Sequence, residues 1–330
     1  MKKFMNAVDD ILAESLRGFA AAHADIVALH RNPVFVTRAA SPIKGKVALI
    51  SGGGSGHEPL HAGFVGRGML DAACPGQVFT SPTPDQMAAA AAAVDGGSGV
   101  LFIVKNYSGD VMNFEMGADI ASAANASVIT NDDVAVENST YTTGRRGVAG
   151  TVVVERMVGA AAEDGADLAA CKALGERVNR ATRSMGVALT SCTVPAAGRP
   201  TFDIGETEME LGVGIHGEPG RRRVPLGPAD DIARGMIEAI HADLAPKPGT
   251  PMLLLVNGFG ATPLMELYLV YDAARRFCAG KGLAIARSLV GNYTTSLDMA
   301  GCSITLSQLD DELIRLWDRP LHTAALRWGC

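Results

Sequence analysis

The residues best suited to chemistry lie in SGGGSGHEPLHAGFVGRG, residues 51–68. The glycines predict a loop that exposes backbone N–H groups to the oxygens of a small polar ligand. Within the same stretch, HEPLH (His57 to His61) matches the H-E-x-x-H pattern, in which two histidines on a helix bind zinc and the glutamate acts as a base. The two interpretations predict different chemistry, and Pro59 decides between them.

The zinc interpretation requires His57 and His61 to lie one turn apart on the same helix. A proline inside a helix costs about 3 kcal/mol. Proline is favourable only near a helix start, which would leave His57 in the preceding loop. No third ligand follows at the spacing of this class of zinc enzyme. We therefore expect no metal site here.

A second pattern, LGVGIHGEPG, satisfies G-x-G-x-x-G through Gly212, Gly214 and Gly217. A dinucleotide fingerprint must open a helix whose N-terminus holds the pyrophosphate. The chain continues here as EPGRRRVPLGP, which is too rich in proline and glycine to form that helix. The P-loop pattern is also absent from the sequence, so we expect no standard nucleotide site.

Three polar residues remain, each after an apolar run that is typical of a buried strand. They are His57 in SGHEP, Asp110 in KNYSGD and His216 in GIHGEPG. Because each follows such a run, all three could converge at one rim of a sheet. Asp110 could instead be the N-cap of a helix that begins near Val111, and isolated histidines are often structural. Taken alone, the residues indicate a small polar ligand site with acid–base groups.

The first half of the chain alternates apolar runs with helical patterns. Strands are predicted at 46–51, 99–107 and 126–132, and helices at 84–94 and 111–124. Thr83 and Gln86 form a potential capping box, and Pro84 suits the first helical position. This order predicts an α/β domain with a largely parallel sheet, in which ligands bind beyond the carboxyl ends of the strands.

The pattern changes after two further helices predicted at 148–162 and 168–183. Extended runs at 185–194 and 209–217 have few helices between them. A helix at 229–244, a strand at 252–256, a helix at 263–279 and strands near Leu283 and Ile304 follow. We expect two α/β domains, 1–185 with the glycine loop and Asp110, and 186–330 with His216 and a mixed sheet.

Composition narrows the class of protein. The 330 residues are 48% hydrophobic with a formal net charge of -6, which argues against a nucleic-acid binder. The basic cluster Arg221 to Arg223 fits either a solvated loop or an anion contact. Six cysteines without a C-x-x-C pair are typical of reduced thiols in the cytosol. The apolar runs are too short to cross a membrane, and the N-terminus resembles an amphipathic helix, not a signal peptide. A soluble cytoplasmic protein is expected.

Several long motifs carry a resemblance to a known family. They include ALISGGGSGHEPLHAGFVGRGMLDAACPGQVFTSPTPDQ, VKNYSGDVMNFEM, DDVAVENS, GRRGVAGTVVVE, CTVPAAG, GVGIHGEPG and NGFGATPLMELY. Together they resemble the substrate-binding subunit of dihydroxyacetone kinases. The likeness is collinear and extends from near the N-terminus to SLDMAGCSITL and beyond.

The resemblance implies roles for particular residues. In that family a histidine adds to the ketone carbon of a short ketose and forms a hemiaminal, and His216 is the matching position. His57 matches an active-site histidine, and Asp110 matches the acid–base aspartate near the hydroxyl that accepts phosphate. The implied substrate contacts are Gly54, Ser55, Gly56, His57, Lys105, Asp110 and His216. Without the resemblance, Lys105 at a strand end would be interpreted as a solvated lysine.

The resemblance also implies partners. Full-length kinases of the family carry a second, helical nucleotide domain, and this chain ends at Cys330, so a stand-alone subunit is expected. ADP or ATP and magnesium would be held by a separate subunit, which a phosphoenolpyruvate-derived phosphoryl donor could recharge, and this chain would bind no cofactor. A homodimer is expected. The alternatives are a dihydroxyacetone-sensing co-regulator of transcription and a kinase subunit for a four-carbon ketose such as erythrulose.

Overall fold

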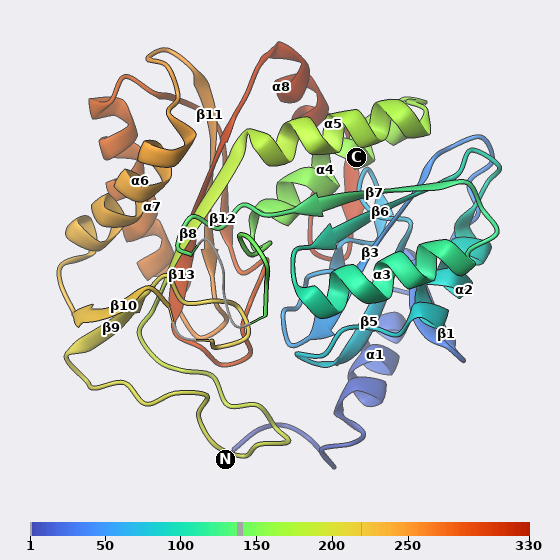
Figure 1. The fold of residues 1–330 in the computed structure, drawn as a ribbon, viewed down its shortest axis with the longest axis horizontal. Coiled ribbons are helices and arrows are strands. Elements are labelled where there is room, and N and C mark those ends of the chain that lie inside the picture. Colours follow the sequence, from blue (N-terminus) through green and yellow to red (C-terminus); the bar gives the residue numbers. More distant parts are fainter. Residues whose placement is uncertain (1, 137–140, 219) are drawn as a thin grey trace. The chain divides into compact units, whose positions relative to one another are not determined.

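The computed structural model describes residues 2–136, 141–218 and 220–330 (Figure 1), which form two compact units. The first unit comprises Met1–Ile129, Val154–Arg177 and Leu316–Cys330, and the second comprises Thr130–Val153 and Val178–Arg315. The boundary expected at Gly186 lies inside strand β8 (Thr182–Ala188), which belongs to the second unit. These units therefore differ from the consecutive segments 1–185 and 186–330.

The first unit is built on a six-stranded sheet. Its strands lie in the order β1 (Val27–Arg31), β2 (Val34–Arg38), β5 (Ala72–Val78), β3 (Ala48–Ser55), β6 (Val100–Lys105) and β7 (Asn125–Thr130). β3 pairs with β5 and β6 in parallel, whereas β2 pairs with β1 and β5 in antiparallel register. The parallel centre agrees with the prediction, and every residue of β3 and β6 is buried.

Two helices pack side by side against this sheet, α2 (Pro84–Val94) and α3 (Ser108–Ile120) (Figure 1). The capping box predicted for α2 is present, because the Thr83 N–H donates to the Gln86 side chain at 2.8 Å. Their small and aromatic side chains, among them Ala90, Ala91 and Phe114, pack with the apolar residues of β3 and β6 in one core.

Several elements of the chain's first half and of its C-terminus lie outside this sheet. They are α1 (Ile11–Ala22), the 3-10 turn η1 (Ala62–Phe64), and the three-stranded sheet of β4 (Gly66–Arg67), β14 (Leu321–Thr323) and β15 (Arg327–Trp328). Two long helices, α4 (Gly150–Glu163) and α5 (Leu168–Arg180), follow β7 along the chain. Their bounds agree with the predicted helices to within three residues.

The second unit contains a mixed six-stranded sheet, as predicted. The order is β10 (Arg222–Pro225), β9 (Glu208–Leu211), β8, β13 (Gly301–Gln308), β11 (Pro251–Gly258) and β12 (Ala284–Gly291). Only β11 and β12 run parallel; the other described pairs are antiparallel. The strand expected over 185–194 ends at Ala188, and the one expected over 209–217 ends at Leu211, where Gly212 adopts a left-handed φ of 80°.

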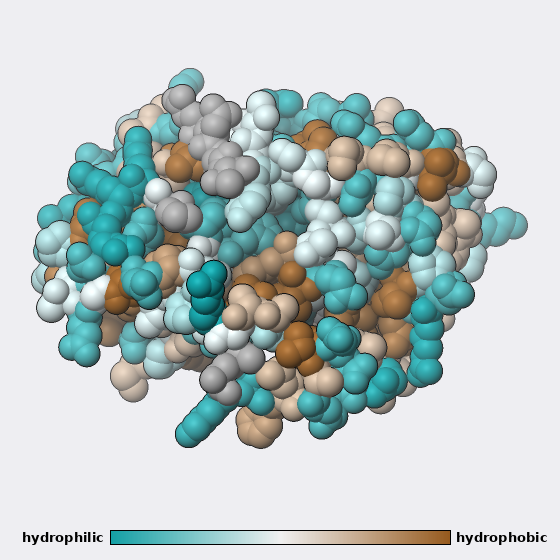
Figure 2. All heavy atoms as spheres, turned by 60° about the horizontal axis from the view of Figure 1, so that its bottom comes forward, coloured by the Kyte–Doolittle hydropathy of each residue, from teal (hydrophilic) through white to brown (hydrophobic). Residues whose placement is uncertain are grey.

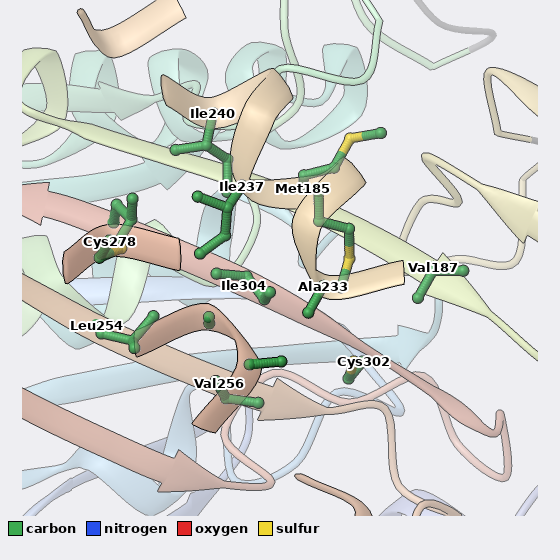
Figure 3. Packing of buried hydrophobic residues seen from close by; sticks show 14 of the residues in the cluster. Met185, Val187, Ala233, Ile237, Ile240, Leu254, Val256, Cys278, Cys302 and Ile304 are labelled. Carbon is green, nitrogen blue, oxygen red and sulfur yellow. The ribbon is translucent and has the colours of Figure 1, made fainter. Parts of the chain in front are cut away.

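Helices α6 (Ala229–Leu244) and α7 (Leu264–Gly280) lie side by side on this sheet, and α8 (Asp311–Asp318) follows β13. Figure 3 shows Ile237 and Ile240 of α6 in one cluster with Leu254 and Ile304 from the strands. Burial of these aliphatic side chains is the main favourable term in the stability of the unit.

Within the described ranges, no helix has both the length and the apolar character needed to cross a membrane. Figure 2 shows hydrophilic and hydrophobic residues interspersed on one face of the molecule.

We expect Leu254→Ala to reduce the free energy of unfolding by about 2–5 kcal/mol, because the fully buried side chain would leave a cavity in the second core. Urea denaturation would measure the change. The matched control is Leu269→Ala in α7, where the side chain is 58% exposed and the expected change is within about 0.5 kcal/mol. Equal effects of the two substitutions would contradict this account of the core.

Candidate active site

The glycine loop is the carboxyl end of β3 in the first unit. A Cβ at Gly54 would lie 2.6 Å from the Thr80 backbone nitrogen and 2.7 Å from Phe79 backbone atoms. A Cβ at Gly53 would overlap the ammonium of Lys105. Only glycine fits at these two positions, because the neighbouring backbone and the lysine approach the strand directly.

Two polar groups of the loop are already hydrogen-bonded within the protein. The Ser55 hydroxyl donates to the Gly76 carbonyl at 2.7 Å, and the Gly56 N–H donates to both carboxylate oxygens of Glu58 at 3.0 Å. The Gly56 N–H therefore stabilises the turn after β3 through its hydrogen bonds to Glu58. The ligand-facing N–H predicted from the glycine pattern is not found at this residue.

His57 follows the loop and is buried. Its ring stacks on Phe79, with centroids 5.0 Å apart and planes 15° from parallel. Phe79 adopts a left-handed φ of 55°, which is uncommon for a bulky residue, and its N–H donates to the Ser55 carbonyl at 2.9 Å. His57 to His61 form turns rather than a helix, so the two histidines lack the zinc-protease geometry.

Lys105 ends β6 and is completely buried, so the solvated-lysine alternative is wrong. Its Nζ donates to the Gly52 carbonyl at 3.0 Å and lies 2.9 Å from His61 Nε2. Asp110 Oδ2 is 3.6 Å away. An ammonium can only donate hydrogen bonds, so His61 Nε2 acts as the acceptor.

Asp110 lies in the first turn of α3, not before it. The helix begins at Ser108 with Tyr107 as its N-cap, so the alternative of an Asp110 N-cap is wrong. The positive end of the helix dipole favours a carboxylate at this position. Asp110 is 3% exposed, and its Oδ1 has no hydrogen-bond partner in the part of the chain that the structure describes. A buried acceptor of this kind is suited to a ligand hydroxyl.

His61 and Glu155 are site residues that the sequence interpretation missed. His61 Nδ1 lies 2.6 Å from Glu155 Oε1, and both side chains are buried. Burial, followed by the charges of Lys105 and His57, lowers the pKa of His61. Burial raises the pKa of Glu155 to about 8, against the opposing effects of Lys105 and Ser51. The one feature of the sequence that could have indicated Glu155 is its place as a single acidic residue inside the largely apolar run TVVVERMV.

A cavity of about 420 Å³ lies against the glycine loop in the first unit. Part of the cavity wall is formed by loop residues and a histidine, namely Gly53, Gly54, Ser55 and His61. Most of the rest of the cavity wall is apolar. It includes Leu12, Leu16 and Phe19 of α1, together with Pro59, Leu60, Cys74 and Pro75. The loop therefore borders a partly open cavity of a size suited to a small ligand.

His216 belongs to the second unit, in the turns that follow β9. The possibility that His57, Asp110 and His216 follow strands of one sheet is not realised. β3 and β6 belong to the first sheet, whereas β9 belongs to the second. The predicted second domain with a mixed sheet already contained His216, and His216 lies in the second unit.

A fully buried arginine organises the surroundings of His216. Arg146 Nε donates to Asp133 Oδ2 at 2.7 Å, its Nη2 donates to the Gly212 carbonyl at 2.7 Å, and its Nη1 lies 3.4 Å from Glu218 Oε1. Burial raises the pKa of Asp133 to about 6, although the charge of Arg146 opposes the shift. The sequence interpretation missed Arg146, Asp133 and Glu218.

Glu218 links this arginine to His216. Its Oε2 accepts the His216 backbone N–H at 2.9 Å and lies 3.9 Å from His216 Nδ1. Burial alone would raise the pKa of Glu218, but interaction with the His216 side chain and the charge of Arg146 lower it to about 2. At neutral pH, Glu218 is thus a carboxylate on the Nδ1 side of the His216 ring. The Tyr141 ring packs edge-on against the His216 ring, with centroids 6.3 Å apart.

In the described residues, no group of three or more histidine, cysteine or acidic side chains is placed to hold a metal ion.

Comparison with known proteins finds a match to the Dak1 domain family over residues 17–325. The chain is 50% identical to the dihydroxyacetone-binding subunit of the PEP-dependent dihydroxyacetone kinase of Escherichia coli strain K12, over the full length of both chains. It is 51% identical to the corresponding subunit of the PTS-dependent dihydroxyacetone kinase 1 of Listeria innocua, with 94% of this chain and 95% of that protein covered.

Among solved structures, the dihydroxyacetone kinase operon co-activator DhaQ superposes with a TM-score of 0.89 at 32% identity. The match covers 94% of this chain and 97% of that one.

The raised pKa of Glu155 predicts a specific pH dependence of stability. Its pKa is about 8 in the folded protein against 4.5 for the free side chain, so between these values the folded state binds more protons. Stability contributed by this group is complete below pH 4.5 and falls as the pH rises toward 8, by up to about 1.4 kcal/mol per pH unit.

Urea denaturation between pH 5.5 and 8 would measure this dependence. The wild type should lose stability more steeply than Glu155→Gln, which cannot ionise. Parallel pH profiles for the two proteins would contradict the assignment.

Proposed function

Because the chain belongs to the Dak1 domain family, we propose that it is the dihydroxyacetone-binding subunit of a dihydroxyacetone kinase. One observation carries the proposal beyond family membership. The buried Oδ1 of Asp110, which has no hydrogen-bond partner among the described residues, lies beside the glycine loop and Lys105. A ketose hydroxyl would supply the donor that this carboxylate lacks.

The ketose is held covalently on His216. The lone pair of a ring nitrogen forms a bond to the ketone carbon, and the C=O π electrons move to the oxygen. The proton of the other ring nitrogen ends on that oxygen, which gives a hemiaminal. We place the new bond on Nε2, because Nδ1 faces the Glu218 carboxylate at 3.9 Å. Glycerol has no electrophilic carbon, so this bond selects ketoses over polyols.

Phosphoryl transfer requires removal of a proton from the terminal hydroxyl of the bound ketose. Asp110 accepts that proton, and the neighbouring Lys105 ammonium offsets the negative charge that develops on the oxygen. His57 completes the acid–base set, held by its stacking on Phe79. Gly54, Ser55 and Gly56 bring the backbone close to the substrate.

The proposal includes a second subunit for the nucleotide. That partner holds ADP or ATP with magnesium and donates the phosphoryl group in line to the bound ketose. A phosphoenolpyruvate-derived phosphoryl donor recharges it, in keeping with the names of the E. coli and Listeria relatives. The chain here binds no cofactor of its own and acts as a homodimer in the cytoplasm.

A second candidate function is a dihydroxyacetone-dependent co-activator of transcription. The TM-score of 0.89 to an operon co-activator favours it. A sensor needs the covalent histidine but not the acid–base pair, and this chain has both His57 and Asp110. The kinase subunit is therefore the better-supported function. Erythrulose in place of dihydroxyacetone would leave the same chemistry intact.

The covalent site is tested by carbon NMR of the purified chain with carbonyl-labelled dihydroxyacetone. The labelled carbon should move from the ketone region to the tetrahedral region with the wild type. It should stay in the ketone region with His216→Ala, which lacks the nucleophile. His241→Ala in α6 is the control and should behave as the wild type. A tetrahedral signal that survives in His216→Ala would place the bond elsewhere.

The base is tested by Asp110→Asn in an assay with a nucleotide-carrying kinase subunit. We expect kcat to fall by about 10²- to 10⁴-fold, because the amide cannot accept the hydroxyl proton. The control is Asp119→Asn, an exposed position on the same helix, which should leave kcat unchanged. Full activity of Asp110→Asn would remove Asp110 from the mechanism. Phosphorylation by the chain alone with ATP would contradict the need for a partner.

A further inference from the structure

The buried side chains behind the glycine loop form a line, Glu155–His61–Lys105–Asp110, whose last two members belong to the proposed site. We propose that His61 and Glu155 are positioning residues that hold the Lys105 ammonium back from Asp110, so that Asp110 stays basic enough to take the hydroxyl proton. This inference rests on the proposed phosphorylation of a ketose and adds two residues to it.

The hydrogen bonds along the line have a single direction. Lys105 Nζ can only donate, so His61 Nε2 must carry the lone pair that accepts at 2.9 Å. The proton of the neutral ring then lies on Nδ1, which faces Glu155 Oε1 at 2.6 Å. Glu155 thereby fixes the tautomer of His61, and the tautomer fixes an acceptor for Lys105.

The distances show what this arrangement prevents. A charge-assisted N–H···O bond between lysine and a carboxylate is about 2.7–2.9 Å long. Lys105 Nζ instead lies 3.6 Å from Asp110 Oδ2, while the Gly52 carbonyl and His61 accept two of its three protons. A contact ion pair would stabilise the ionised form of Asp110 and make it a weaker base.

The cluster contains other titratable groups besides Lys105. The titratable groups that meet there are Asp110 from α3, Glu155 from α4, and His57 and His61 from the turns after β3. Burial keeps His61 neutral and raises the pKa of Glu155 to about 8. A protonated carboxyl still offers its carbonyl oxygen to the His61 N–H. While Glu155 is protonated, neither it nor the neutral His61 adds a charge beside Lys105.

Two substitutions of His61 separate positioning from simple packing. His61→Gln keeps an acceptor for Lys105 and a donor for Glu155, whereas His61→Leu fills similar space without polar atoms. In the reconstituted kinase assay, we expect His61→Leu to lower kcat by about 10²-fold, as a 1 Å misplacement can, with KM changed less than about threefold. The acid limb of its pH–kcat profile should move to lower pH by about one unit. His61→Gln should recover most of the activity and the wild-type profile.

A measurement on the chain alone tests the same geometry without turnover. Nitrogen-15 NMR of labelled histidine should show His61 as a neutral ring protonated on Nδ1 between pH 6 and 8, and Glu155→Gln should preserve that tautomer. Protonation on Nε2 would overturn the proposal. It would also fall if His61→Leu changed stability but left kcat and the pH profile as in the wild type.

Failure of the underlying function gives a different result. If the wild type, with a nucleotide-carrying subunit, phosphorylates neither dihydroxyacetone nor erythrulose, the kinase proposal falls and this inference falls with it. If the wild type is active and His61→Leu matches it in kcat and pH profile, only the positioning role is removed.

Discussion

The first unit depends on how it accommodates one fully buried ammonium, that of Lys105. An unpaired charge in the interior costs several kcal/mol, so each neighbour of Lys105 is constrained. Gly53 must lack a side chain to admit Nζ, His61 must present a lone pair, and the Gly52 carbonyl must point inward. Asp110 supplies the opposite charge from the first turn of α3. The glycine loop, His61 and the first turn of α3 are thus brought together by their contacts with this one ammonium.

The second unit applies the same principle with an arginine. Arg146 is completely buried, and its guanidinium joins Asp133, Glu218 and the Gly212 carbonyl across three segments of the chain. Its planar fork of donors suits this task better than a lysine would. The result at His216 is a carboxylate held on one side of an imidazole. Each unit therefore places a proposed site residue, Asp110 or His216, near a fully buried cation.

Local signals in the sequence predicted the elements well. α2 and α6 begin and end at the predicted residues, because Thr83, Gln86 and Pro84 mark one start and a long apolar periodicity marks the other. The glycine loop at the carboxyl end of β3 was also anticipated, and the roles of His57, Asp110 and His216 remain predictions. The pairs His61–Glu155 and Arg146–Glu218 were not, because their partners lie 94 and 72 residues apart and neither pair has a periodic pattern.

The close approach at Gly53 and Gly54 limits how this site can change. The backbone of Phe79–Thr80 and the Lys105 ammonium occupy the space that any side chain at these positions would need. A side chain at Gly53 or Gly54 therefore cannot change the volume of the cavity without displacing these groups. The volume of the adjoining cavity depends instead on other lining residues, among them Leu12, Leu16 and Phe19 of α1, whose side chains line it.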